Sequence, residues 1–234
     1  MRALLSKASG GPETLALSDL PDPVAAPGQV VIAVRACAIN FPDVLIIEDK
    51  YQFKPQRPFA PGGEIAGVID QIGDGVEGWA VGDRVIAMLG HGGLCEKVIA
   101  DPAKLYRLPE GRSFAEGASL ILTYGTTIHA LLDRGHLKAG QTLLVLGAAG
   151  GVGLAAIELG KAFGTRVVAA VSSEEKAAAA RQAGADETAA TTLAPNALPS
   201  SIAARPTPPA APSTSRVCPA WICPRSSNAW IVVP

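Results

Sequence analysis

Residues 142–153 of this 234-residue chain read TLLVLGAAGGVG, and they are the clearest indication of its fold. The first five of these residues form a continuous apolar run, which is typical of a β-strand buried on both faces of a parallel sheet. Gly147, Gly150 and Gly153 follow, and a helix of small residues is predicted over 154–163. A glycine loop between a buried strand and a helix is the arrangement that binds the pyrophosphate of a dinucleotide.

The glycines of this loop have separate expected roles. Gly150 would let the backbone approach a pyrophosphate, and Gly153 would let the helix pack close to the strand. The helix N-terminus would offer free N–H groups and a partial positive charge to the anion. The spacing departs from the usual G-x-G-x-x-G, because Ala148 stands where the second glycine would be. The alternative is a tight turn without a ligand, but the flanking strand and helix favour the dinucleotide site.

The segment after the loop indicates which dinucleotide is bound. A second buried strand at 166–171 and a helix at 174–182 complete a βαβα unit. A site for NAD usually has an acid at the tip of this second strand, whereas Ser172 and Ser173 stand there. Both serines, with Lys176, would suit a 2′-phosphate, although the charges of Glu174 and Glu175 oppose one. We therefore favour NADP over NAD, the alternative being that Lys176 is an ordinary solvated helix charge.

Residues 1–124 are predicted to form a compact, partly closed β domain. Strands are expected at 29–37, 63–72, 82–87, 94–100 and 104–108. Gly67 marks a bulge or a close backbone approach within the second of them. Ser113 and Glu116 have the spacing of a capping box, and a helix over 123–134 is expected to stop at Gly135.

The glycine loop and four further segments resemble the medium-chain dehydrogenase/reductase superfamily, most closely its zinc-free quinone oxidoreductases of the zeta-crystallin type. These segments are AINFPD at 38–43, PGGEIAGV at 61–68, WAVGDRV at 79–85 and TYGT at 123–126. The resemblance implies an α/β fold, with a GroES-like substrate and catalytic domain at 1–124 and the first half of a Rossmann domain at 125–190. It also implies zinc-independent hydride transfer from NADPH to a quinone or an activated alkene.

The resemblance assigns site residues as well. Asn40 and Tyr51 match positions that line the substrate and nicotinamide pocket, and Thr126 matches a position beside the nicotinamide. Gly150, Gly151, Val152 and Lys176 match contacts to the pyrophosphate and the 2′-phosphate. The pattern of the loop and of the second strand adds Gly147, Gly153, Ser172 and Ser173 to the expected cofactor site. Asn40 would orient the substrate, and Tyr51 would donate a proton or pack on a ring, the alternative being a surface aromatic. A second pocket tyrosine of some members would fall at Leu45, so a mechanism with a tyrosine pair is not expected.

A metal-free site is expected, because the zinc ligands of related enzymes are replaced. Catalytic zinc needs nitrogen and sulfur donors in tetrahedral positions. Asn40 stands where the first Cys ligand of zinc-dependent relatives would be, and Gly63 stands where their His would be. Cys37 is expected in the core, and His91, His129 and His136 are expected in loops or on helix surfaces. Asp43 is expected to hold its loop together rather than to take part in chemistry.

The composition changes abruptly after residue 187. All 25 glycines lie at or before Gly184, and all 21 acidic residues lie at or before Glu187. The segment 191–234 is rich in proline, and we expect it to be irregular. It would be either a natural disordered tail or an out-of-frame translation that begins near 188–195, and the abrupt change favours the second. One edge of strand 142–146 would then stay unpaired, with poor stability, weak NADPH oxidation and loss of the surface through which the family usually forms homodimers.

Composition narrows the functional classes further. A formal net charge of −1 argues against a strongly electrostatic partner such as nucleic acid or a membrane surface. Neither a signal peptide nor a membrane span is recognisable, so we expect a soluble cytoplasmic protein with a small-molecule substrate. Two alternatives remain open: an enoyl-thioester reductase of the same superfamily, and a non-catalytic remnant that at most binds NADPH.

Overall fold

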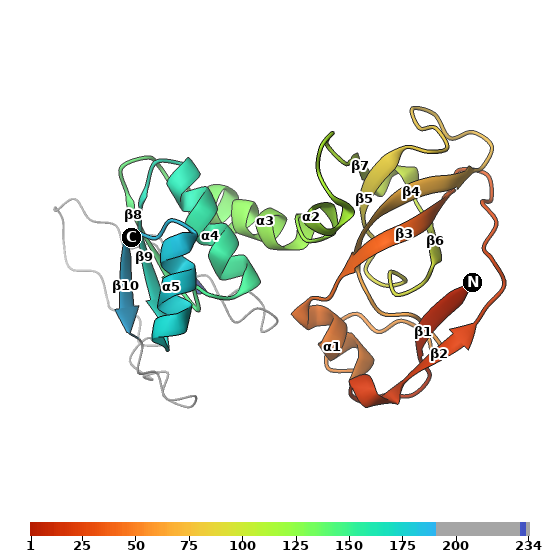
Figure 1. The fold of residues 1–234 in the computed structure, drawn as a ribbon, viewed down its shortest axis with the longest axis horizontal. Coiled ribbons are helices and arrows are strands. Elements are labelled where there is room, and N and C mark those ends of the chain that lie inside the picture. The colour runs from red at the N-terminus through yellow and green to blue at the C-terminus, as the bar shows by residue number, and fades with distance from the viewer. Residues whose placement is uncertain (191–229, 233–234) are drawn as a thin grey trace, which may run out of the picture. The chain divides into compact units, whose positions relative to one another are not determined.

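The computed structural model describes residues 1–190 and 230–232 of the chain. They belong to two compact units, Met1–Leu122 and Thr123–Pro234, coloured red to green and green to blue in Figure 1. Each unit has its own sheet and its own hydrophobic core.

Unit 1 is built on a five-stranded antiparallel sheet in the order β6-β3-β4-β5-β7. The strands are β3 (Val30–Ala38), β4 (Glu64–Ile72), β5 (Arg84–Met88), β6 (Lys97–Ala100) and β7 (Leu105–Arg107). A separate antiparallel pair is formed by β1 (Arg2–Ser6) and β2 (Leu15–Asp19). All five strands expected for the sheet are therefore present, and β6 begins three residues later than predicted.

The core of the five-stranded sheet in unit 1 is formed mainly by β-branched side chains. Val30, Ile32 and Ile65 are fully buried there. A Cβ atom at Gly67 would lie 2.3 Å from the carbonyl oxygen of Ala33, and the β3–β4 register shifts nearby. Only glycine allows this approach between the two strands, which confirms the predicted close contact.

Two helices belong wholly to unit 1, α1 (Phe41–Ile47) and α2 (Phe114–Ala118). Short 3₁₀ turns occur at Pro12–Thr14 and Pro102–Lys104. The predicted capping box begins α2: Ser113 N donates to the Glu116 carboxylate at 2.8 Å, and Glu116 N donates to Ser113 Oγ at 3.2 Å. The reciprocal bonds satisfy two N–H groups that the helix itself leaves without partners.

Unit 2 has a sheet in the order β10-β9-β8-β11, of which the first three strands are parallel. Its elements are β8 (Thr142–Leu146), α4 (Gly151–Ala162), β9 (Arg166–Val171), α5 (Glu174–Gln182) and β10 (Glu187–Ala190). Leu143, Val145, Ile157 and Val167 are fully buried between sheet and helices. The strand–helix–strand–helix alternation predicted from the sequence is confirmed (Figure 1).

Two helices differ from their predicted bounds. The helix expected over 123–134 is α3 (Ile121–Ile128) followed by a π-helical segment, His129–Arg134. The wider turn is closed by Gly135 N, which donates to the carbonyl oxygen of Ala130 at 2.8 Å. Helix α4 begins at Gly151 instead of residue 154, because Gly150 already has the extended backbone of an N-cap residue.

The expectation that one edge of β8 stays unpaired is wrong. Strand β11 (Trp230–Val232) pairs with β8 in antiparallel orientation, with Trp230 opposite Leu146. An open strand edge is a template for further pairing, and the sequence Trp-Ile-Val favours a strand. The rest of the segment expected to be irregular, 191–229 and 233–234, lies outside the described residues. Within the described part of the chain, no helix is long and apolar enough to cross a lipid bilayer.

Candidate functional site

The glycine loop joins β8 to the N-terminus of α4. Gly147, Gly150 and Gly151 are exposed, and Val152 is half-buried. Among the residues that the structure describes, no side chain caps α4, whose N-cap residue is Gly150. The first N–H groups of a helix lack partners within the helix and carry a partial positive charge. This end of α4 therefore presents backbone donors, without a competing side chain, to an anion.

Gly153 keeps the loop and the helix in close contact. A Cβ atom at this position would lie 2.6 Å from the carbonyl oxygen of Gly147 and 2.8 Å from Cα of Ala148. The loop could not follow its path against α4 with any other residue here, as the sequence predicts. Thr127 Oγ1 donates to the carbonyl oxygen of Val152 at 3.3 Å, which also ties α3 to the first turn of α4. Thr126, next to it on α3, is half-buried.

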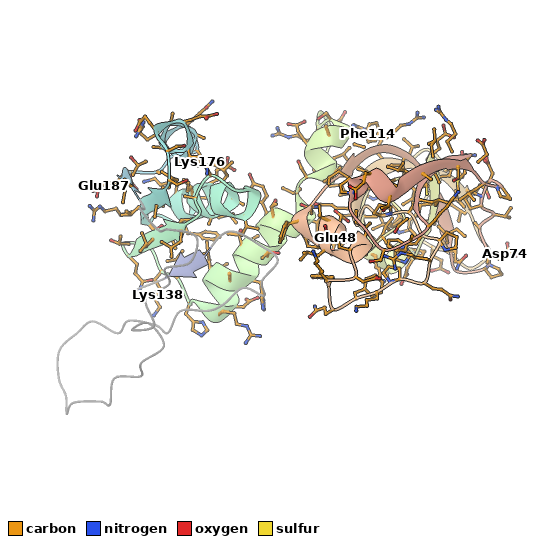
Figure 2. The ribbon with its side chains drawn as sticks, turned by 90° about the horizontal axis from the view of Figure 1, so that it is seen from below. Glu48, Asp74, Phe114, Lys138, Lys176 and Glu187 are labelled. Atoms are coloured by element: carbon orange, nitrogen blue, oxygen red, sulfur yellow. The ribbon has the colours of Figure 1, made fainter. Side chains whose placement is uncertain are left out.

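Ser172, Ser173 and Lys176 come together at the end of β9. The Nζ atom of Lys176 donates to Ser172 Oγ at 3.0 Å, and the backbone N of Lys176 donates to Ser173 Oγ at 3.3 Å. All three residues are exposed, and the Lys176 side chain extends from the first turn of α5 (Figure 2). Glu174, which opposed a phosphate in the sequence, is bonded to the guanidinium of Arg181.

The residues of unit 2 fit a dinucleotide with a 2′-phosphate. An uncapped helix N-terminus suits the pyrophosphate, and two hydroxyls with an ammonium group suit a second phosphate. The pairing of Glu174 with Arg181 compensates one of the two charges that would repel it. NADPH would be held by these groups, and its chemistry would be the delivery of a hydride.

Asn40 is the N-cap residue of α1, and its side chain is held by a buried carboxylate. Its Nδ2 atom donates to Oε2 of Glu64 at 3.1 Å, and its backbone N donates to Oδ2 of Asp43 at 2.7 Å. The neighbours Ile39 and Phe41 are 60% and 44% exposed. The backbone N and the side-chain Nδ2 of Asn40 are therefore both held by carboxylates, and the residues on either side of it in sequence are exposed and apolar.

Asp43 holds the loop around Asn40, as expected from the sequence. Its Oδ1 atom accepts hydrogen bonds from the backbone N atoms of Gly62 and Gly63, both at 3.1 Å. Burial raises the pKa of the Asp43 carboxyl, and the three backbone N–H groups act in the opposite direction. The carboxylate thus joins the start of α1 to the turn before β4.

Glu64 is a site residue that sequence reasoning missed. Its side chain is fully buried, and Oε1 accepts a hydrogen bond from the backbone N of Leu122 at 3.0 Å. Burial raises the pKa of Glu64, and its hydrogen bonds with Leu122 and Asn40 lower it. The one signal in the sequence is an acid at the head of the apolar run EIAGVI.

Tyr51 is half-buried and packs against Ile46, Ile47 and Phe59. Asn40 precedes the first residue of α1, whereas Tyr51 follows its last residue by four positions. The described contacts of these two residues do not join them. The predicted pair of catalytic residues is therefore divided between the two ends of one helix.

Comparison with known proteins agrees with this architecture. A family model for the alcohol dehydrogenase GroES-like domain matches residues 26–110, and one for zinc-binding dehydrogenases matches 151–203. The quinone oxidoreductase of Homo sapiens is 39% identical over 189 residues, 80% of this chain and 57% of that protein. The chain is a member of the medium-chain dehydrogenase/reductase superfamily.

Solved structures of the superfamily resemble the chain in fold. The quinone oxidoreductase from Thermus thermophilus, solved also in complex with NADPH, superposes with a TM-score of 0.72 at 38% identity, covering 81% of this chain and 60% of that one. An NAD-dependent alcohol dehydrogenase reaches 0.79 at 35% identity, with coverage of 82% and 64%. Unit 1 is thus the GroES-like domain and unit 2 is of the Rossmann type. The chain spans little more than half the length of the curated relatives it matches.

Gly63, expected from the sequence to replace a zinc-ligating His, lies close to the backbone of Gly90. A side chain at Gly63 would begin 3.2 Å from the carbonyl oxygen of Gly90, so the backbone leaves little room for an imidazole. Cys37 packs against the core as expected, and burial raises its pKa to about 12. His91 lies in a loop but is half-buried, and its ring is 5.8 Å from those of Phe53 and Phe59. Within residues 1–190, no three His, Cys, Asp or Glu side chains form a group that could hold a metal.

Proposed function

We propose that this chain binds NADPH through unit 2 and transfers its hydride to a quinone or an activated alkene without zinc. The observation that carries the proposal is the uncapped N-terminus of α4 together with the Ser172–Lys176 pair at the end of the next strand. The similarity to quinone oxidoreductases supports the same reaction class. Residues 1–124 would then form the substrate and catalytic domain, and 125–190 the NADP-binding part.

The two phosphate groups would bind at different places in unit 2. The pyrophosphate would lie against the backbone of residues 147–153, with the N–H groups of Gly151 and Val152 as donors at the start of α4. The N–H of Gly150 already donates to the carbonyl oxygen of Gly147 at 3.0 Å, so Gly150 would contribute close approach of its backbone. The 2′-phosphate would bind Ser172, Ser173 and Lys176, where hydroxyl and ammonium groups give charge-assisted hydrogen bonds. Thr126 would contact the nicotinamide end, as the resemblance to the superfamily implies.

On the substrate side, Asn40 would orient the acceptor. A quinone accepts hydride readily, so catalysis would depend mainly on positioning. The Nδ2 atom of Asn40 has two hydrogens, of which Glu64 takes one. The second is available for a carbonyl oxygen of the substrate, which becomes more negative as hydride arrives. The apolar contacts of Tyr51 favour ring packing over proton donation.

The test is an NADPH fluorescence titration of the whole chain, followed by turnover assays with benzoquinone and with crotonyl thioester. Saturable binding and oxidation of NADPH by benzoquinone would support the proposal. Turnover of the thioester alone would favour an enoyl-thioester reductase. Binding without turnover of either substrate would favour a non-catalytic NADPH-binding protein, and absence of binding would refute the cofactor assignment.

A further inference from the structure

One buried carboxylate in unit 1 contacts two elements that are distant in sequence. Glu64, at the start of β4, has no exposed surface. Its Oε2 atom accepts from Asn40 Nδ2 at 3.1 Å, and its Oε1 atom accepts from Leu122 N at 3.0 Å. The two contacts span 24 and 58 residues of sequence. Each oxygen therefore has its own partner, and both partners are donors.

Burial raises the pKa of the Glu64 carboxyl, and the hydrogen-bond donors around it act in the opposite direction, toward the ionised form. Leu122 lies in the first turn of α3, where backbone N–H groups carry a partial positive charge. A carboxylate at this end of a helix is stabilised by the helix dipole and by direct hydrogen bonds. Glu64 is thus a partner of α3 and of Asn40 at the same time.

An ionised carboxylate fixes the orientation of the amide that faces it. An asparagine side chain has a donor end and an acceptor end, and a half-turn about its last bond exchanges them. Glu64 accepts hydrogen bonds only, so the nitrogen of Asn40 must face it and Oδ1 must face away. The backbone of Asn40 is held as well, because its N–H donates to Asp43 at 2.7 Å.

We propose that Glu64 is a positioning residue that fixes which end of the Asn40 amide is offered to the substrate. It holds one hydrogen of Nδ2 and leaves the second hydrogen and Oδ1 in set places. A hydride acceptor whose carbonyl oxygen needs a donor is then bound in one orientation. This inference rests on the proposed function for its catalytic consequence, but the amide orientation itself does not depend on turnover.

The catalytic consequence is tested by a double-mutant cycle of Glu64→Gln with Asn40→Ala. Glutamine keeps the size of the side chain, but it supplies one acceptor and one donor. The Asn40 amide can then rotate by half a turn and present either end to residue 64. We expect kcat/KM with benzoquinone to fall about tenfold in the native background and to change less than about twofold in the Asn40→Ala background. Equal losses in both backgrounds, or no loss in the native one, would overturn the proposal.

A second readout does not need activity. The side-chain amide resonances of Asn40 in a ¹⁵N–¹H spectrum of the whole chain should move in Glu64→Gln. They should stay in place in Glu116→Gln, which removes an exposed capping carboxylate that bonds Ser113. Unchanged Asn40 resonances in Glu64→Gln would overturn the inference.

If Glu64→Gln does not fold, Glu64→Asp keeps the charge but shortens the reach, and the same resonances should then move. A native chain that oxidises NADPH with neither benzoquinone nor an activated alkene would refute the proposed function, whereas the resonances would still decide the orientation of Asn40.

Discussion

The two candidate sites of this chain use opposite means to hold a ligand. In unit 2, the glycine loop offers exposed backbone donors, and the exposed cation Lys176 lies at the end of the neighbouring strand. In unit 1, the polar groups around Asn40 are buried carboxylates that face inward, toward the backbone. The first arrangement would bind an anion directly, whereas the second uses its charges to fix the position of one neutral amide. Substitutions should therefore affect cofactor binding in unit 2, and stability or substrate orientation in unit 1.

The largest effect on NADPH binding is expected from a substitution at Gly153 in the glycine loop. Gly153→Ala places a Cβ atom 2.6 Å from the carbonyl oxygen of Gly147, so the loop must move. We expect the Kd for NADPH to rise about 100-fold or more, which corresponds to about 2.8 kcal/mol, with a lower Tm. Fluorescence titration and thermal unfolding measure the two effects.

Gly150→Ala is the matched control for that loop. Its Cβ atom would meet only the Gly147 oxygen, at 3.5 Å, which is an ordinary contact. This variant should keep the Tm of the native chain while NADPH binds more weakly, because the methyl group lies where the pyrophosphate would. Native affinity for NADPH in both variants would contradict the placement of the cofactor at this loop.

The next effect concerns stability in unit 1. Asp43→Asn replaces one acceptor oxygen by a donor that faces backbone N–H groups of Asn40 or of Gly62 and Gly63. A buried N–H group left without an acceptor costs about 1–3 kcal/mol, so the free energy of unfolding should fall by about that amount. Urea unfolding measures it. Asp70→Asn, which breaks a half-exposed ion pair with Lys97, should cost less than about 1 kcal/mol. Equal losses in the two variants would mean that the buried hydrogen bonds of Asp43 stabilise the fold no more than a half-exposed ion pair does.

These two sites were also predictable to different degrees. The glycine loop, β8, β9 and α5 follow from residues that are adjacent in sequence, so spacing alone predicts them. Glu64 could not be recognised in this way, because its partners lie 24 and 58 positions away. The pairing of β11 with β8 likewise depends on which segments the fold brings together. Local pattern predicts where a backbone site begins, whereas a buried polar network requires the tertiary structure.

A smaller effect tests the specificity of unit 2. Lys176→Ala removes the ammonium group that donates to Ser172. We expect the Kd for NADPH to rise about tenfold and the Kd for NADH to change less than about twofold, since only NADPH has the 2′-phosphate. Lys138→Ala, at an exposed lysine labelled in Figure 2, is the control and should leave both constants unchanged. Parallel losses for the two cofactors would show that Lys176 contributes general charge rather than specificity.

The smallest expected effect is a difference in how Glu64 of unit 1 and Asp186 of unit 2 make the free energy of unfolding depend on pH. Burial raises the pKa of Glu64 above its ordinary value of 4.5, with Asp43 adding to the rise. The folded state then binds the proton more tightly than the unfolded state, so this contribution to stability is present below about pH 4 and is lost as pH rises through the folded pKa. In unit 2, Lys161 and the backbone N of Val167 lower the pKa of Asp186 below 3.8, and its contribution is lost as pH falls.

Urea unfolding of the native chain, Glu64→Gln and Asp186→Asn across this range measures both contributions. The advantage of the native chain over Glu64→Gln should shrink as pH rises above 4.5, and its advantage over Asp186→Asn should shrink as pH falls below 3.8. Two further titratable groups interact with Glu64: Asp43, which is present in both the native chain and Glu64→Gln, and Cys37, whose pKa is raised to about 12 so that it stays protonated throughout. Slopes of the same sign for both variants would mean that the two carboxylates do not differ in the way that their burial implies. Opposite slopes would show that the fold disfavours the charged form of Glu64 in unit 1 and favours the charged form of Asp186 in unit 2.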